Sequence, residues 1–203
     1  VMKMVRSDSS SSGIMFTLDT ETGFKEVVHI SSIFGVGELI VKGRITPDDF
    51  YVFKPTLKKG FKSVIIKNIG RKTRKYIYGA NGGLKDVPTT KKEETSFSLT
   101  EDEVLTLAKW GCIIEEHYGI AQDIEWAKDG QTKKLFIVQA RPETVISQKD
   151  HNVLEEYILK QKGKLIVEGG SVGSKIGVGK ANVIKDVSGI YNFKKGEVLV
   201  TDM

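Results

Sequence analysis

Two strand-like segments separated by a short turn constrain the fold of this chain more than any other feature. They are DIEWA at residues 123–127 and FIVQARP at residues 136–142, and the turn between them contains Gly130. Alternate residues of a strand share one face of a sheet. The polar residues of each segment therefore lie on one side. The pattern predicts a β-hairpin with one polar face.

The pairing of this hairpin brings four polar side chains together. A turn at residues 130–134 sets Asp123 opposite Arg141 and Glu125 opposite Gln139. One interpretation is an ordinary cross-strand ion pair on a wet face, which stabilises little. The other is a metal–nucleotide site, in which Glu125 and Gln139 offer oxygens to Mg²⁺ and Arg141 meets phosphates. The apolar flanks, including Trp126, predict a largely buried strand. Burial favours the second interpretation, because buried charges need partners.

A family resemblance covers nearly the whole chain. The strings DIEWAKDG…KLFIVQARPET, VMKMVRSD…SGIMFTLDTETGF and DDFYVFKPTL resemble the phosphoenolpyruvate synthase (pyruvate, water dikinase) family. The resemblance implies an α+β fold made of two incomplete domains. The C-terminal part of an ATP-grasp nucleotide-binding domain is expected at residues 1–145, then a linker at 146–162. The start of a β-rich swivelling phosphohistidine domain is expected at 163–203.

The resemblance also implies roles for individual residues. Glu125 holds Mg²⁺ with help from Gln139, Asp123 positions this cluster or the ribose side, and Arg141 neutralises charge on the phosphates. Glu38 aligns with an acidic residue near the adenosine or the metal. It follows a two-glycine loop that lacks the third glycine and the Lys-Ser or Lys-Thr of phosphate-binding loops, so a solvated turn is the alternative for Glu38.

The resemblance implies an enzyme that uses ATP, water and pyruvate to give AMP, phosphoenolpyruvate and phosphate through a phosphorylated histidine. His29, His117 and His151 do not stand in the Thr-Cys-His-like motif of that histidine. We therefore expect an excerpt of a longer enzyme that works with the remaining domains of the same polypeptide. The isolated excerpt is expected to be inactive and to bind ATP weakly or not at all. Related dikinases and phosphotransferases of the family remain alternatives, and the oligomeric state is left open.

The charge distribution suggests a second class of function. Residues 50–85 hold no acidic residue and ten of the basic ones, so the net charge of +5 would be −5 without them. Aromatic residues interleave with these charges, as on nucleic-acid-binding surfaces. The same segment is also typical of two strands, 63–67 and 75–78, in a solvated hairpin. A non-catalytic nucleic-acid-binding module is therefore the rival function, and the hairpin interpretation weakens it.

Local signals predict several other elements. Thr100 and Glu103 form a capping-box pattern before a helix that should reach Tyr118 and stop at Gly119. Residues 86–97 are expected to form a mobile polar loop. Residues 164–168, 176–183 and 196–200 are expected to be β-like segments with glycine-rich turns.

The single cysteine and the lack of long apolar runs bear on location. Cys112 lacks a disulfide partner within the chain and suits a reducing cytoplasm, where it is expected to be a buried thiol. Because the chain contains no long apolar run, we expect neither a transmembrane helix nor a membrane partner.

Overall fold

The computed structural model divides the chain into two compact units, residues 1–158 and 159–203. The predicted linker, residues 146–162, lies almost entirely outside the described residues, as does His151. The domain boundaries drawn from the sequence stay predictions. The structure describes residues 3–144, 158, 160–161, 163–166, 176–185 and 187–201.

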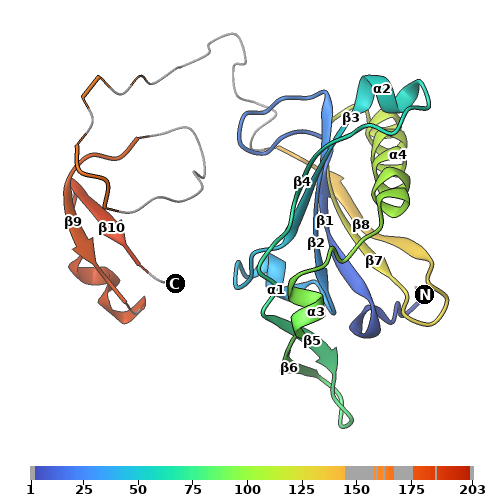
Figure 1. The fold of residues 1–203 in the computed structure, drawn as a ribbon, viewed down its shortest axis with the longest axis horizontal. Helices are drawn as coiled ribbons and strands as arrows, with labels where there is room; N and C mark the ends of the chain where they lie inside the picture. Colours follow the sequence, from blue (N-terminus) through green and yellow to red (C-terminus); the bar gives the residue numbers. More distant parts are fainter. Residues whose placement is uncertain are drawn as a thin grey trace. The chain divides into compact units, whose positions relative to one another are not determined.

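A six-stranded antiparallel sheet forms the body of the first unit (Figure 1), with strand order β4-β3-β2-β1-β7-β8. Strands β1 to β4 follow one another along the chain and pair in sequence. The hairpin β7–β8 then joins at the free side of β1. The strands are β1 (Ser11–Phe16), β2 (Val27–Phe34), β3 (Asp48–Phe53), β4 (Val64–Asn68), β7 (Gln122–Lys128) and β8 (Leu135–Pro142).

One long helix, α4 (Glu101–Tyr118), lies against one face of this sheet (Figure 1). Its N-terminus carries the predicted capping box, in which Thr100 and Glu103 each satisfy the other's backbone N–H, and it ends at Gly119 as predicted. Apolar side chains of alternate strand positions fill the interface with the helix. The buried cluster includes Met15, Val28, Ile30, Phe50, Val52, Val104, Leu107, Ala108, Ile124 and Trp126.

A separate two-stranded sheet, β5 (Arg74–Tyr78) with β6 (Leu84–Pro88), follows β4. A second buried cluster of Ile33, Leu39 and Tyr76 attaches β5 to the short helix α1 (Glu38–Val41). The remaining short helices of the first unit are η1 (Ser7–Ser9), α2 (Lys54–Lys58) and α3 (Lys91–Glu94).

Two predictions for residues 63–97 are wrong. Segments 63–67 and 75–78 do not pair with each other: β4 pairs with β3, and β5 pairs with β6. Residues 86–97 are not a loop throughout, because they include the end of β6 and α3, whose capping box is formed by Thr90 and Glu93. Both segments of the expected hairpin do form strands. Their alternation indicated strands, whereas the choice of partner depends on contacts distant in sequence.

The prediction that the FIVQARP strand is largely buried is also wrong. β8 is an edge strand of the sheet, and its residues from Val138 to Pro142 are exposed. Its partner β7 lies between β1 and β8, so Ile124 and Trp126 are almost completely buried. An apolar strand pattern does not distinguish an edge position from an interior one.

The described part of the second unit contains β9 (Lys180–Val183) and β10 (Glu197–Val200), which pair in parallel. The helix η2 (Val187–Asn192) lies between them in sequence. The strand expected at 196–200 is confirmed over 197–200, whereas the strand expected at 176–183 forms only over 180–183. Residues 163–166 are described without strand structure, and the glycines at 169, 170 and 173 lie outside the described residues.

Cys112 is buried, as expected, and burial raises the pKa of its thiol. Across the parts of the chain that the structure describes, no helix is long and apolar enough to cross a membrane.

Candidate functional site

The four polar residues of the β7–β8 hairpin meet as the sequence predicts. Asp123 lies opposite Arg141 and Glu125 lies opposite Gln139. Across the other edge of β7, Asp123 pairs with Phe16 and Glu125 pairs with Ile14. These positions alternate with the core residues of β1 and β7. The polar group therefore occupies the face of the sheet opposite to α4.

This pairing depends on one extra residue in β8. Trp126 pairs with Ile137 and Glu125 pairs with Gln139, so Val138 has no opposite residue on β7. Such a register shift is a β-bulge. Without it, the pairing that starts at Trp126 would set Glu125 opposite Val138 and Asp123 opposite Ala140. The shift therefore brings the four polar residues together, and no residue pattern in the sequence indicated it.

Asp123 and Arg141 form an ion pair, in which Nε and Nη2 of the arginine lie 2.8 Å and 2.7 Å from one carboxylate oxygen, Oδ2. The hydrogen bond to Asp123 raises the pKa of Arg141 above its usual value. The Arg141 side chain is 67% exposed and that of Asp123 only 15%. An ion pair this exposed stabilises little, and its guanidinium is within reach of an incoming anion.

A cavity of about 700 Å³ opens on the same face of the sheet, next to the four polar residues. Glu125 reaches it from β7 and Glu38 reaches it from α1, so two of the predicted site residues share one cavity. Among the described residues, Asp123, Gln139 and Arg141 do not line it. Apolar and hydroxyl-bearing side chains make up much of its wall, namely Ser12, Ile14, Val36, Val41, Tyr78, Ala127, Phe136 and Val138.

The first part of the two-glycine loop before Glu38 is hydrogen-bonded within the protein. The backbone N–H of Val36 donates to the carbonyl of Tyr76 at 3.0 Å, so it is already used. Gly37 is the N-cap of the one-turn helix α1, and Glu38 pairs with Lys42, the residue after that helix. Glu38 is half-buried and lines the cavity.

The sequence did not indicate that Lys3, Arg6 and Tyr78 lie at or near the cavity. The Nζ of Lys3, which lines the cavity, lies 4.8 Å from the ring centroid of Phe136. The guanidinium of Arg6 lies 5.6 Å from the ring centroid of Tyr78. The sequence pattern predicts only a solvated hairpin for Tyr78, and its neighbours in space make it part of the cavity wall.

The predicted Mg²⁺ site would take only some of its ligands from the protein. No group of three or more His, Cys, Asp and Glu side chains that could hold a metal occurs among the residues the structure describes. Mg²⁺ usually takes one or two carboxylates together with substrate phosphates and water. Glu125 and Gln139 are directly opposite in the ladder, where Cβ atoms are about 5 Å apart, so both oxygens can reach one ion.

Asp129 organises the turn that sets this pairing. Its carboxylate accepts hydrogen bonds from the backbone N–H groups of Thr132 (2.7 Å), Gln131 (3.1 Å) and Arg6 (3.2 Å). These bonds, with that from Thr132 the largest contribution, lower the pKa of Asp129 to about 2. The turn therefore favours the ionised carboxylate and holds the N-terminal segment at the same time.

The low pKa of Asp129 predicts an acid-sensitive contribution to stability. Its folded pKa lies below the ordinary aspartate value of 3.8, so this contribution is complete above about pH 4 and is lost as the pH falls towards about 2. We expect wild type to resist urea better than Asp129→Asn at pH 6, with the two urea midpoints converging below pH 4. Urea titrations of both proteins across pH 2–7 measure this. A midpoint difference that stays constant down to pH 2 would contradict the prediction.

Comparisons with known proteins agree on one family. The family model described as "Pyruvate phosphate dikinase, AMP/ATP-binding domain" matches residues 1–161. Proteins described as phosphoenolpyruvate synthase align with the whole chain: 52% identical in Aquifex aeolicus, 50% in Synechocystis sp. and 48% in Escherichia coli. The chain covers 25%, 26% and 26% of these proteins, so it spans about a quarter of the length of the curated relatives it matches.

Proposed function

We propose that this chain, which belongs to the pyruvate phosphate dikinase AMP/ATP-binding domain family, provides one side of the Mg-ATP site of a phosphoenolpyruvate synthase. The observation that carries the proposal is the meeting of Glu38 and Glu125 in one cavity, with Asp123, Gln139 and Arg141 beside it on the same sheet face. The antiparallel sheet supports assigning the first unit to the C-terminal part of an ATP-grasp domain. The swivelling phosphohistidine domain is proposed for the second unit on resemblance alone.

Different residues around the cavity would bind different parts of the nucleotide. The apolar and hydroxyl-bearing lining suits the base and ribose, because such pockets use a few polar groups to fix orientation. Glu38 faces this part of the cavity and can accept hydrogen bonds from ribose hydroxyls. The phosphates then extend over β7 and β8 towards Arg141. Phosphoryl transfer depends mainly on such positioning and on charge stabilisation.

Glu125 and Gln139 would hold Mg²⁺ against the phosphate oxygens. The ion, when bound, neutralises phosphate charge and orients the chain of phosphates. Arg141 donates to the phosphate oxygens as the bond to the leaving group breaks, since its planar fork matches their geometry. Asp123, less exposed than Arg141, holds the guanidinium in place until the phosphates arrive.

The proposed activity consumes ATP, pyruvate and water and releases AMP, phosphoenolpyruvate and phosphate. The acceptor histidine and the pyruvate site belong to other parts of such an enzyme, so pyruvate and the remaining domains are the proposed partners. A cytoplasmic location is part of the proposal, because the single buried thiol Cys112 suits a reducing compartment.

The rival nucleic-acid function gains no support from the basic segment. Most of its ten cations are already paired with acidic side chains of neighbouring elements. A surface neutralised in this way is a weak attractant for phosphate backbones. The paired cations are Lys54, Lys62, Lys67, Lys72, Arg74 and Lys75.

Product analysis of the full-length protein that carries this sequence tests the proposal. With Mg-ATP and pyruvate we expect AMP, phosphoenolpyruvate and orthophosphate in equal amounts, with no requirement for added phosphate. A requirement for phosphate together with pyrophosphate release would instead indicate a related dikinase. Formation of ADP, or no nucleotide turnover that depends on pyruvate, would contradict the proposal.

A further inference from the structure

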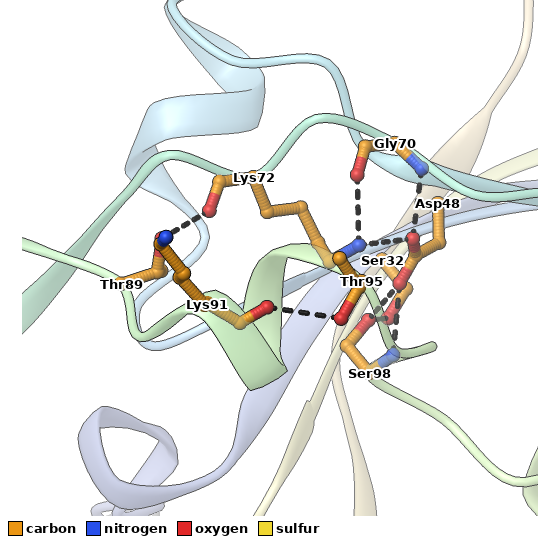
Figure 2. A network of polar contacts seen from close by, with 8 residues as sticks. All are labelled: Ser32, Asp48, Gly70, Lys72, Thr89, Lys91, Thr95 and Ser98. Atoms are coloured by element: carbon orange, nitrogen blue, oxygen red, sulfur yellow. Dashed lines mark hydrogen bonds and ion pairs between the residues drawn. The ribbon is translucent and has the colours of Figure 1, made fainter.

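A fully buried ion pair lies outside the lining of the cavity and outside the residues assigned to the nucleotide. Asp48 is the first residue of β3, Lys72 precedes β5, and both side chains are 0% exposed. The Asp48 carboxylate also accepts hydrogen bonds from the N–H of Gly70 at 2.9 Å and from the N–H and hydroxyl of Ser98 at 2.8 Å each. Figure 2 shows these residues around the carboxylate. One carboxylate therefore fastens the segments before β5 and before α4 to the sheet.

The loop that carries Lys72 is tightly seated. The Lys72 ammonium donates to the carbonyl of Gly70 at 2.9 Å, and the carbonyl of Lys72 accepts from the hydroxyl of Thr89 (Figure 2). A Cβ atom at Gly70 would lie 2.0 Å from the carbonyl oxygen of Pro47, so only glycine allows this approach. The loop is thus fixed both by its charge and by its backbone.

This loop leads directly into the cavity wall. β5 begins at Arg74, two residues after Lys72, and its last residue, Tyr78, lines the cavity. Tyr76 packs against Leu39, the neighbour of Glu38 in α1, and its carbonyl accepts the hydrogen bond from Val36. The ion pair, β5 and α1 therefore form one continuous support.

We propose that Asp48 and Lys72 are positioning residues of the nucleotide site. Their ion pair fixes the wall that carries Glu38 and Tyr78 relative to the sheet that carries Glu125. The inference rests on the proposed function. A buried ion pair is often replaceable by apolar residues with little loss of stability, so stability alone gives weak reason for it. Orientation of the site gives a stronger reason for the pair. A mutation far from the reacting atoms that displaces the site by 1 Å can reduce the rate about 100-fold.

Two variants separate positioning from stability. Lys72→Met leaves the buried Asp48 carboxylate unpaired, so it should destabilise the fold. The double variant Asp48→Asn/Lys72→Met removes the unpaired charge and should recover part of the thermal stability, because the amide keeps only one oxygen to accept from the N–H groups of Gly70 and Ser98. It should not recover the placement of the wall, because the directional ammonium–carboxylate contact is still absent. Arg74→Met is the matched control, since it removes an exposed ion pair with Asp86 on the same hairpin.

Hydrogen exchange measures the position of the wall in this chain without nucleotide. We expect the double variant to exchange the Val36 amide, which bonds to Tyr76, at least about tenfold faster than wild type. The β1 and β7 amides should be unchanged, and Arg74→Met should match wild type throughout. Unchanged exchange at Val36 would overturn the proposal whatever the ligand of the cavity is.

Kinetics of the full-length protein measure the consequence for the nucleotide. In the double variant we expect KM for ATP to rise by between about tenfold and 100-fold while KM for pyruvate stays the same. Faster exchange at Val36 with an unchanged KM for ATP would also overturn the proposal, because the pair would then serve stability only. If wild type fails to use ATP, the proposed function fails instead. Should the double variant not fold, Thr89→Val, which removes only the hydroxyl that holds the Lys72 carbonyl, undergoes the same two measurements.

Discussion

Replacing Arg141 by methionine is expected to lower the rate of phosphoryl transfer from ATP in the full-length protein by about 10³-fold. Arginine donors of this kind act on charge that develops as the phosphate bond breaks, so their loss reduces kcat more than it raises KM. The stability of the fold should change by about 1 kcal/mol or less, because the Arg141 side chain is 67% exposed. Rapid-quench measurement of AMP formation and thermal unfolding give the two readouts.

The matched control for Arg141→Met is Arg74→Met. Arg74 also bonds an aspartate at 2.8 Å on a two-stranded hairpin, and both side chains are exposed, at 54% and 41%. Loss of a surface arginine by itself should therefore leave the rate unchanged. If Arg141→Met lost less than about tenfold in rate, or no more than Arg74→Met, the ordinary surface ion pair would be the correct interpretation. The Asp123–Arg141 contact would then have no part in the reaction.

Replacing Trp126 by alanine is expected to destabilise this chain by about 3–5 kcal/mol, the range for removing a fully buried large aromatic side chain. Trp126 is 1% exposed and packs in the cluster between the sheet and α4. It lies opposite Gly13 on β1, where an added Cβ would come 2.8 Å from the indole ring. The strand pair is thus built around this one large side chain, and its loss leaves a cavity that the backbone of β1 cannot easily fill. Urea unfolding followed by circular dichroism measures the change.

Ile113→Ala is the control for this prediction, because Ile113 lies on α4 but is 63% exposed. Its loss should cost less than about 0.5 kcal/mol, as for ordinary surface positions. Trp126→Phe should fall between the two. It keeps most of the buried area and removes an indole N–H that is buried without a hydrogen-bond partner among the described residues. A loss below about 2 kcal/mol for Trp126→Ala would show that the core relaxes around this position.

The candidate site could be predicted in part because its information is local. Asp123, Glu125, Gln139 and Arg141 stand on two strands joined by one short turn, so alternation and the turn fix which faces they share. Glu38 entered only through family resemblance. Glu38 and Glu125 line the same cavity although they are 87 residues apart in sequence, and only the tertiary structure brings α1 and β7 together. The bulge at Val138 could not be predicted, because the residues of β8 alternate equally well with or without this shift in register.

By itself, the sequence determined the family of this chain, the α4 helix with its capping box and the polar face of the β7–β8 hairpin, since these depend on residues close together in the chain. Tertiary structure alone decided that β8 is an exposed edge, that β4 and β5 belong to different sheets and that Lys72 is buried against Asp48. The physical reason is that alternation specifies a strand and its faces, whereas partner, edge position and burial follow from which distant segments compete to cover it.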